Sequence, residues 1–533
     1  MIKRPSKVLN SIKINISTFI LIFMLFLVNF QISAEKKDVS LEERISILEE
    51  MIEDQKLDRA VKKYESVNGM GPAASGVYNA SSAFSIGGYA EVKYKDYQSR
   101  YKKDMADVHR LILYTGYRFN DWIIFNGEVE YEHAGFEKGD TVSDVDFTKQ
   151  KTKKSGINEG SVFVEFAYLD FKFHETLQLS LGMNLVPIGI TNYMHEPTTF
   201  FSVERPLTET YIIPTTWGEI GALLHGNFLN NKITYRTGIL TGMKGEDFSD
   251  SGWIRGGRQK GSKVQAESAA YIFNLETKPS DSLTIGGSYY KGEADQNSIV
   301  SIHTARTSLS GSDPWGFKPF LEEEYQRQNL EKVELNLAEA HFIYKYKDFS
   351  TRALFARGWM NENDVRALNS ATGKNIGLAA EGGYLEVGYN IFGHLKTEQK
   401  LVVFVRSEYL NTQKETVRRY AGGREDIADA VCENILLGTC KTTSQLADKN
   451  RSLGIIENSS PLKEAYGIKG VSDRRNDRRI ITYGVSYFPH PNVSIKMDYE
   501  VHNSKTDSFL DYERKNFSTN KEDVFNIGIG VIF

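Results

Sequence analysis

The sequence predicts an all-β fold, an antiparallel transmembrane β-barrel of about sixteen strands that follows a short periplasmic helix or coiled coil. Three observations predict it: an apolar run behind basic residues at the start, an alternation of apolar and polar residues beyond position 84, and short turns that alternate with long polar loops. In chain order we expect a signal peptide over 1–34, a helical or coiled-coil segment over 35–67, a linker over 68–83 and the barrel over 84–533.

Composition and charge narrow the class of protein. The 533 residues carry a formal net charge of −4 and a mean hydropathy of −0.39, which excludes a bundle of membrane helices. A membrane barrel is compatible with such a value, because its strands are apolar on one face only. The near-neutral charge gives no reason to expect nucleic acid as a partner. The 28 tyrosines and 30 phenylalanines suit an all-β chain with aromatic girdles.

The first residues have the layout of an export signal. Lys3 and Arg4 begin a basic stretch, the apolar run FILIFMLFLV covers 19–28, and the small-residue sequence ISA ends at Ala34, after which we expect cleavage. The alternative is an uncleaved anchor helix, but the uncharged run is short for a span of about 20 residues. An exported chain that enters a membrane as a sheet must close that sheet, because lipid pairs with no backbone group.

Two cysteines lie in a long polar segment, in the sequence CENILLGTC. An exported chain meets oxidising conditions, which favours a small loop disulfide between Cys432 and Cys440. A zinc site is disfavoured, because no histidine or second cysteine pair stands at ligand spacing.

A helical pattern precedes the barrel. Leu41, Ile45, Leu48 and Ile52 repeat at heptad spacing with charged residues between them. This pattern fits either a short solvated helix or a small coiled coil in the periplasm, and two heptads are too few to fix an oligomeric state. The sequence NGMGPAASGVYNASSA at 68–83 is rich in small residues and predicts a linker.

The barrel strands are predicted by an alternation with a period of two. In 493–501, for example, Val, Ile, Met, Tyr and Val alternate with Ser, Lys, Asp and Glu, which places apolar side chains on one face and polar ones on the other. The predicted strands are 84–97, 105–119, 121–133, 159–173, 176–190, 217–229, 231–242, 264–277, 281–293, 330–347, 349–361, 380–391, 400–412, 478–488, 491–503 and 522–533.

The connections between these strands alternate in length. Short turns fall at 120–121, 174–175, 230–231, 279–281, 347–348 and 489–491. Long polar loops fall near 134–158, 191–216, 243–263, 294–329, 362–379, 413–477 and 504–521. Short turns on one side and long loops on the other are typical of outer-membrane barrels. An even strand number then places both ends of the barrel on the short-turn side, which we assign to the periplasm.

The whole layout resembles the phosphate-selective porin O and P family. The resemblance rests on the export signal, the helical prelude, the strands that end in an alternating segment at Phe533, and the stretches 84–94, 109–135, 166–207 and 483–502. Membership implies a trimeric sixteen-stranded pore in which a third long loop folds inward as a constriction. That loop would be 191–216 here.

Selectivity in such a pore would come from charged side chains that line it. The alternation of apolar and polar residues, together with the family's inward loop, gives candidate pore-lining residues of both charges. They are Arg110, Arg118, Glu128, Glu130, Glu204, Arg205, Arg406 and Lys496. The predicted loop contains Arg205 as its single Arg or Lys, against three glutamates. This departs from the phosphate-selective members, whose pores carry many Arg and a Lys cluster, and it favours a general or weakly selective pore.

The favoured function is an outer-membrane porin for passive diffusion of small hydrophilic solutes or ions. Phosphate selectivity and a general, weakly selective pore both stay open. A second reading is a barrel whose long surface loops serve adhesion or partner binding, motivated by the loop at 413–477. An energised transporter is disfavoured, because such barrels have about 22 strands and a plug domain.

No enzyme motif is present in the sequence, and neither a cofactor nor a metal is expected. The His-Glu pairs at His174 and His195 lack the second histidine of a zinc helix. Expected partners are membrane lipid, lipopolysaccharide and small hydrophilic solutes, and the resemblance adds a homotrimer. The expected location is the outer membrane of a Gram-negative cell.

Overall fold

The computed structural model describes residues 66–80, 82–98, 102–134, 160–296, 299–307, 321–329, 333–372, 374–417, 472, 476–504 and 523–533. The predicted signal peptide and the Cys432–Cys440 pair lie outside these residues. The predicted coiled-coil segment lies outside them as well, apart from residues 66 and 67.

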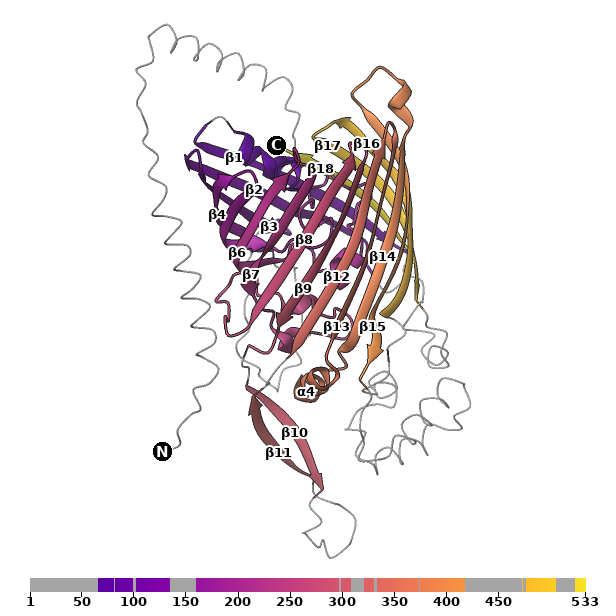
Figure 1. The fold of residues 1–533 in the computed structure, drawn as a ribbon. Helices are drawn as coiled ribbons and strands as arrows, with labels where there is room; N and C mark the ends of the chain where they lie inside the picture. The colour runs from indigo at the N-terminus through magenta and orange to yellow at the C-terminus, as the bar shows by residue number, and fades with distance from the viewer. Residues whose placement is uncertain are drawn as a thin grey trace, which may run out of the picture. The chain divides into compact units, whose positions relative to one another are not determined.

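Sixteen strands of the described part of the chain close into one antiparallel barrel, which confirms the predicted fold (Figure 1). They are β1 (Phe84–Tyr97), β2 (Met105–Asn120), β3 (Ile123–Glu132), β4 (Ser161–His174), β5 (Leu177–Leu185), β6 (Gly218–Phe228), β7 (Ile233–Thr241), β8 (Ala269–Ser280), β9 (Leu283–Glu293), β12 (Glu334–Tyr346), β13 (Phe349–Met360), β14 (Gly377–Asn390), β15 (Lys400–Thr416), β16 (Asp477–His490), β17 (Val493–Ser504) and β18 (Val524–Ile532). Strand β9 pairs with β12, and β18 pairs with β1 to close the sheet.

The barrel wall has an inside-out distribution of polarity. On β17, Lys496 and Asp498 are 3% and 2% exposed, whereas Ile495 and Met497 are 42% and 46% exposed. The alternation read from the sequence therefore sends the polar side chains into the lumen and the apolar ones to the outside. A surface of this kind is stable when its surroundings are themselves apolar.

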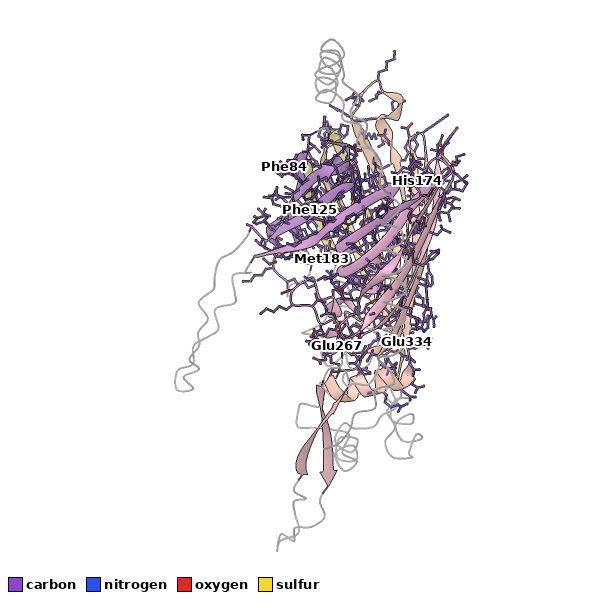
Figure 2. The ribbon with its side chains drawn as sticks, turned by 60° about the vertical axis from the view of Figure 1, so that its left-hand side comes forward. Phe84, Phe125, His174, Met183, Glu267 and Glu334 are labelled. Carbon is purple, nitrogen blue, oxygen red and sulfur yellow. The ribbon has the colours of Figure 1, made fainter. Side chains whose placement is uncertain are left out.

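The turns and loops also follow the predicted asymmetry. Short turns of two to four residues join β2 to β3, β4 to β5, β6 to β7, β8 to β9, β12 to β13 and β16 to β17. At one of these turns Asn230 and Asn231 have φ angles of 54° and 62°, a left-handed conformation that asparagine tolerates. In Figure 2, Phe84 and His174 lie near the end with the short turns, and Glu267 and Glu334 lie near the other end.

Several elements lie where the sequence predicted only loops. Strands β10 (Ile299–Thr307) and β11 (Leu321–Asn329) form a separate two-stranded sheet between β9 and β12. Helix α4 (Glu362–Thr372) follows β13, and its Val365 and Leu368 are buried. Shorter helical turns are η1 (Thr208–Ile212), η2 (Gly245–Asp247), η3 (Arg255–Gly257) and η4 (Ile391–His394). Among the described residues, no helix has the length and apolar character to cross a membrane.

The predicted linker at 68–83 is wrong in its central part. Residues Pro72–Asn79 form helix α3, which packs against β1 and β2 and buries Ala73, Ala74, Val77 and Tyr78. The small residues that suggested a flexible spacer allow the helix to pack closely against the inner side of the wall.

Two apolar clusters lie inside the barrel. One surrounds α3 and includes inward residues of β1 to β5 and β18. The larger one joins the connection at 186–217 and the connection at 242–268 to inward residues of strands from β6 to β16, with Trp217 and Trp253 fully buried. Much of the lumen is therefore packed with side chains.

The apolar outer face predicts a strong effect of charge at its centre. We expect Met497→Arg to lower the free energy of unfolding in lipid vesicles by about 2–4 kcal/mol, the cost of an arginine at a bilayer midplane. The same residue introduced by Glu398→Arg, in the exposed β14–β15 connection, should change it by less than about 0.5 kcal/mol. Equal effects of the two variants in urea titrations would contradict a lipid-facing position for Met497.

Candidate functional site in the barrel lumen

The connection from β5 to β6, residues 186–217, forms the core of the candidate site. Its base is closed by Asn192, whose amide nitrogen donates to Val186 O at 2.6 Å and whose amide oxygen accepts from Trp217 N at 2.8 Å. Because these bonds bring the two ends of the segment together, the residues between them form a compact inner loop. We refer to residues 186–217 as the inner loop.

The inner loop crosses the lumen to the opposite wall, as the family resemblance implied for residues 191–216. The Glu209 carboxylate accepts from Ile190 N and Thr191 N at 2.8 and 2.7 Å within the loop, and Tyr384 of β14 donates to it at 2.6 Å. Further round the wall, Asp498 of β17 accepts from the backbone N–H of Val203, and Glu408 of β15 accepts from that of Thr208. Wall carboxylates therefore hold the loop through its backbone.

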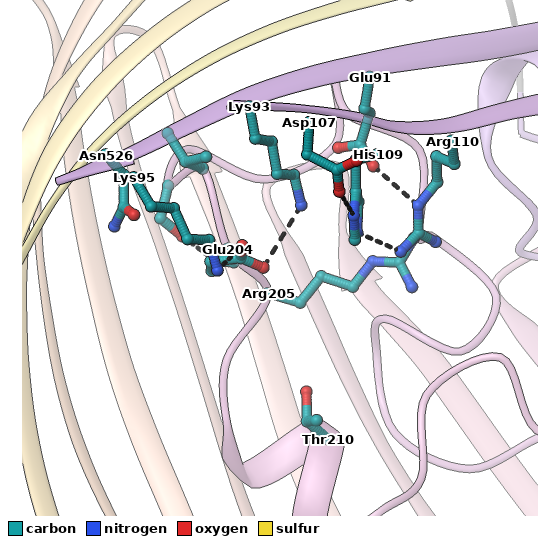
Figure 3. A network of polar contacts seen from close by, with 12 residues as sticks. Glu91, Lys93, Lys95, Asp107, His109, Arg110, Glu204, Arg205, Thr210 and Asn526 are labelled. Atoms are coloured by element: carbon teal, nitrogen blue, oxygen red, sulfur yellow. Dashed lines mark hydrogen bonds and ion pairs between the residues drawn. The ribbon is translucent and has the colours of Figure 1, made fainter. Parts of the chain in front are cut away.

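Glu204 ties the tip of the inner loop to β1. Its carboxylate lies 3.3 Å from Lys93 Nζ and 2.6 Å from Lys95 Nζ (Figure 3). Burial alone would raise the pKa of Glu204, but the two ammonium groups outweigh it and hold the pKa well below its usual range. Glu204 is therefore ionised at neutral pH and neutralises part of the positive charge of β1.

Arg110 is held between carboxylates of neighbouring strands. Its guanidinium lies 3.1 Å from Glu91 of β1 and 3.3 Å from Glu130 of β3, and it also contacts His109 Nε2 at 2.7 Å (Figure 3). His109 itself faces the lumen because the β1–β2 register shifts by one residue there, and its Nδ1 lies 3.4 Å from Asp107. Both ring nitrogens of His109 are thus engaged within the protein.

The other predicted lining residues on the strands also lie on the inner side of the wall. Arg406 pairs with Glu386 at 3.4 Å and also contacts Glu408. Lys496 donates to Ser202 O of the inner loop at 3.0 Å. Arg118 donates to Tyr78 O at 2.9 Å and so contacts α3 rather than open solvent, because α3 fills that part of the lumen. Their role in selectivity stays a prediction.

Arg205 and His195 meet inside the inner loop. Arg205 donates to His195 O at 2.8 Å and lies within hydrogen-bonding distance of the Tyr89 hydroxyl. Burial, followed by the Arg205 charge, lowers the pKa of His195 to about 4. His195 Nδ1 lies 3.0 Å from Asn192 O, an oxygen that only accepts, so Nδ1 carries the proton and Nε2 points toward β3 and β4.

Opposite His195 lie Glu128 and a residue that alternation did not identify, Glu165. The β3–β4 register shifts between Glu128 and Val129, so Glu165 is an additional residue in β4 that pairs with neither. This β-bulge turns the Glu165 side chain inward beside that of Phe166. In a regular strand, two successive side chains would face opposite sides, and Glu165 would face outward.

The chain was compared with known proteins. No model of a known protein family matches it. A protein of Aquifex aeolicus (strain VF5), described as an uncharacterized protein, is 29% identical over 445 residues, which are 82% of this chain and 79% of that protein.

Among solved structures, the chain is similar to bacterial outer-membrane proteins. A loop-deletion mutant of OmpT of Vibrio cholerae is 10% identical, with 85% of this chain and all of that chain covered and a TM-score of 0.42. OmpF of Salmonella typhi is 10% identical, with 84% and 97% covered and a TM-score of 0.42. An anion-selective porin from Comamonas acidovorans is 8% identical, with 84% and 99% covered and a TM-score of 0.41. These likenesses concern the barrel architecture and nothing finer.

The bonds to Glu209 predict how firmly the inner loop is held. Glu209→Ala removes a buried charged acceptor from two backbone N–H groups and from Tyr384, and we expect it to lower the free energy of unfolding by about 3 kcal/mol. Urea titration followed by tryptophan fluorescence measures this loss, since Trp217 and Trp253 are buried beside the loop. Glu246→Ala, at a partly exposed position with a 3.6 Å pair to Lys244, is the control and should change the value by less than about 0.5 kcal/mol.

Proposed function

We propose that this chain is an outer-membrane channel through which small hydrophilic solutes or ions diffuse passively. One observation carries the proposal: a closed sheet that exposes apolar side chains outside and buries charged ones inside. Such a wall belongs in lipid, and a polar lumen inside it gives dissolved molecules a path across. A trimeric state, which rests on the family resemblance, and contacts with lipopolysaccharide, which go with an outer-membrane location, are part of the proposal.

The charges inside the barrel favour weak selectivity over specific phosphate transport. Phosphate recognition needs cationic donors that are free to turn toward the anion. Lys93, Lys95 and Arg110 are engaged by carboxylates, as is Arg406. Pairs of opposite charge produce a weak field at a distance, so neither cations nor anions gain a strong preference from them.

The packed interior indicates a narrow pathway. Helix α3, the inner loop and the connection at 242–268 all bury apolar side chains within the barrel. Water and ions are excluded from such clusters, and we therefore propose that solutes pass beside the tip of the inner loop, along the charged side chains of β1 and β2 (Figure 3).

A second candidate function is binding of a partner at the surface, with transport secondary. The separate β10–β11 hairpin favours it, since a paired extension between β9 and β12 is more than a barrel needs to close (Figure 1). Purified protein in a planar bilayer separates the two functions. Stepwise conductance supports the channel, and a barrel that inserts without conductance supports partner binding.

The position of α3 predicts a change in conductance. Deletion of residues 68–80 removes the helix and its buried side chains, so the single-channel conductance should rise at least about twofold as the freed volume fills with water. Heat-modifiable mobility on gels shows that the shortened barrel has closed. An unchanged conductance in a closed barrel would place the pathway away from α3.

Arg205 predicts the sign of a selectivity change. Arg205→Glu reverses a buried charge of the inner loop, and we expect the reversal potential in a salt gradient to shift toward that of a more cation-selective pore. Lys396→Glu makes the same change in charge at an exposed position of the β14–β15 connection and should leave the potential within error. A shift of equal size in both variants would argue against Arg205 as a lining residue.

A further inference from the structure

We propose that Glu128, Glu165 and His195 form a binding site for one divalent transition-metal ion such as Zn²⁺ or Mn²⁺. The inference is independent of the channel function, since an ion can be held in a barrel that conducts or in one that does not.

The three side chains converge on one point from three separate elements. One ligand atom from each of them lies within 4.8 Å of the other two. His195 Nε2 of the inner loop is 3.3 Å from Glu128 Oε1 of β3 and 3.9 Å from Glu165 Oε2 of β4. All three residues are at most 2% exposed, so bulk water does not stabilise the carboxylate charges.

The carboxylate oxygens of Glu128 and Glu165 have too few hydrogen-bond donors around them. Both oxygens of Glu165 and Oε2 of Glu128 are buried without a hydrogen-bond partner. Of the two nearby guanidinium groups, that of Arg110 is paired with Glu91 and Glu130, and that of Arg205 donates to neutral oxygens. His195 can supply Nε2–H to one oxygen at most, so only a bound cation, or a proton shared with the carboxyl group of Glu128 or Glu130, can satisfy Glu165. Buried charges without partners are strongly unfavourable, and a bound cation would neutralise them.

The surroundings of His195 favour a ligand role for its Nε2. Its Nδ1 lies 3.0 Å from the backbone oxygen of Asn192, an acceptor that fixes the proton on Nδ1 and leaves the lone pair of Nε2 directed at the two carboxylates. Metal-ligating histidines usually donate their second ring N–H to such an oxygen. The Tyr114 hydroxyl lies 3.4 Å from Nε2 and can donate to this lone pair, a long contact that a cation between Nε2 and the two carboxylates would replace.

The β-bulge of β4 is what creates the arrangement. Without the additional residue, Glu165 would face outward, and Glu128 and His195 alone would form a simple pair. An ion held by β3, the β4 bulge and the inner loop would fix the loop to the side of the wall opposite β14, whose Tyr384 holds Glu209.

The donor set selects the class of ion. Two carboxylates and one imidazole suit Zn²⁺, Mn²⁺ and related transition-metal ions, with water completing the coordination. Mg²⁺ and Ca²⁺ prefer oxygen ligands throughout and should bind more weakly. Among the described residues, a second cluster of this kind, Asp107, His109 and His133, carries no proposal, because His109 is already engaged by Arg110 and Asp107.

The experiment uses the full chain, purified folded in detergent, stripped with a chelator and dialysed against Zn²⁺. We expect one Zn²⁺ per chain by elemental analysis, and with Co²⁺ a visible absorption spectrum typical of mixed nitrogen and oxygen ligands. Glu128→Gln and Glu165→Gln should each weaken Zn²⁺ binding at least about tenfold. His195→Gln changes the inner loop and no wall strand, and it should weaken Zn²⁺ binding by a similar factor.

Glu339→Gln is the matched control, because Glu339 is a buried wall glutamate that lies 2.9 Å from a histidine, His341. It should leave Zn²⁺ affinity unchanged within about twofold. The proposal is wrong if the native chain retains no stoichiometric Zn²⁺, which would indicate a proton shared between the carboxyl groups. It is also wrong if the three site variants bind as tightly as the control. Conductance of the same preparations tests the channel separately.

Discussion

The structure depends on the closure of its sheet. Strand β18 pairs with β1 from Tyr89↔Ile532 to Tyr97↔Val524, and beyond that register Gly88 and Phe533 exchange backbone hydrogen bonds at 2.8 and 2.9 Å. This seam leaves the sixteen-stranded barrel sheet without a free edge, which in lipid would carry unpaired N–H and C=O groups. Closure also divides the side chains into an outer set and an inner set, and every polar inward residue must then find a partner inside the barrel.

The inner loop and α3 supply many of those partners. Glu204 of the loop neutralises Lys93 and Lys95, while backbone N–H groups of the loop satisfy Asp498 and Glu408. Glu196 of the loop accepts from Ala73 N and Ala74 N of α3. The contents of the barrel therefore compensate its wall, so the loop is a structural component as well as part of a pathway.

The sequence was sufficient to predict the strands, in which apolar and polar residues alternate regularly. It was insufficient to predict the places where the structure departs from that alternation. All sixteen wall strands follow from the alternation, because one lipid-facing side imposes it on each strand. Glu165 and His109 did not follow, since a β-bulge adds one residue without a sequence signal and reverses the expected direction. Helix α3 was missed because small residues suit a flexible linker and a closely packed helix equally well. Its contacts with the wall are non-local, and no local pattern reports them.

These departures decide where the residual charge of the lumen lies. A guanidinium between two carboxylates, as at Arg110, contributes little field a few ångströms away. An uncompensated group contributes much more inside a wall of low dielectric. Glu165, turned inward by its bulge, adds a second buried carboxyl group beside that of Glu128, and Arg205 on the far side of His195 donates only to neutral oxygens among the described residues. The local imbalance thus comes from one additional residue in β4 and one loop arginine. Whatever occupies the space between Glu128, Glu165 and His195 then sets the net charge along this part of the lumen.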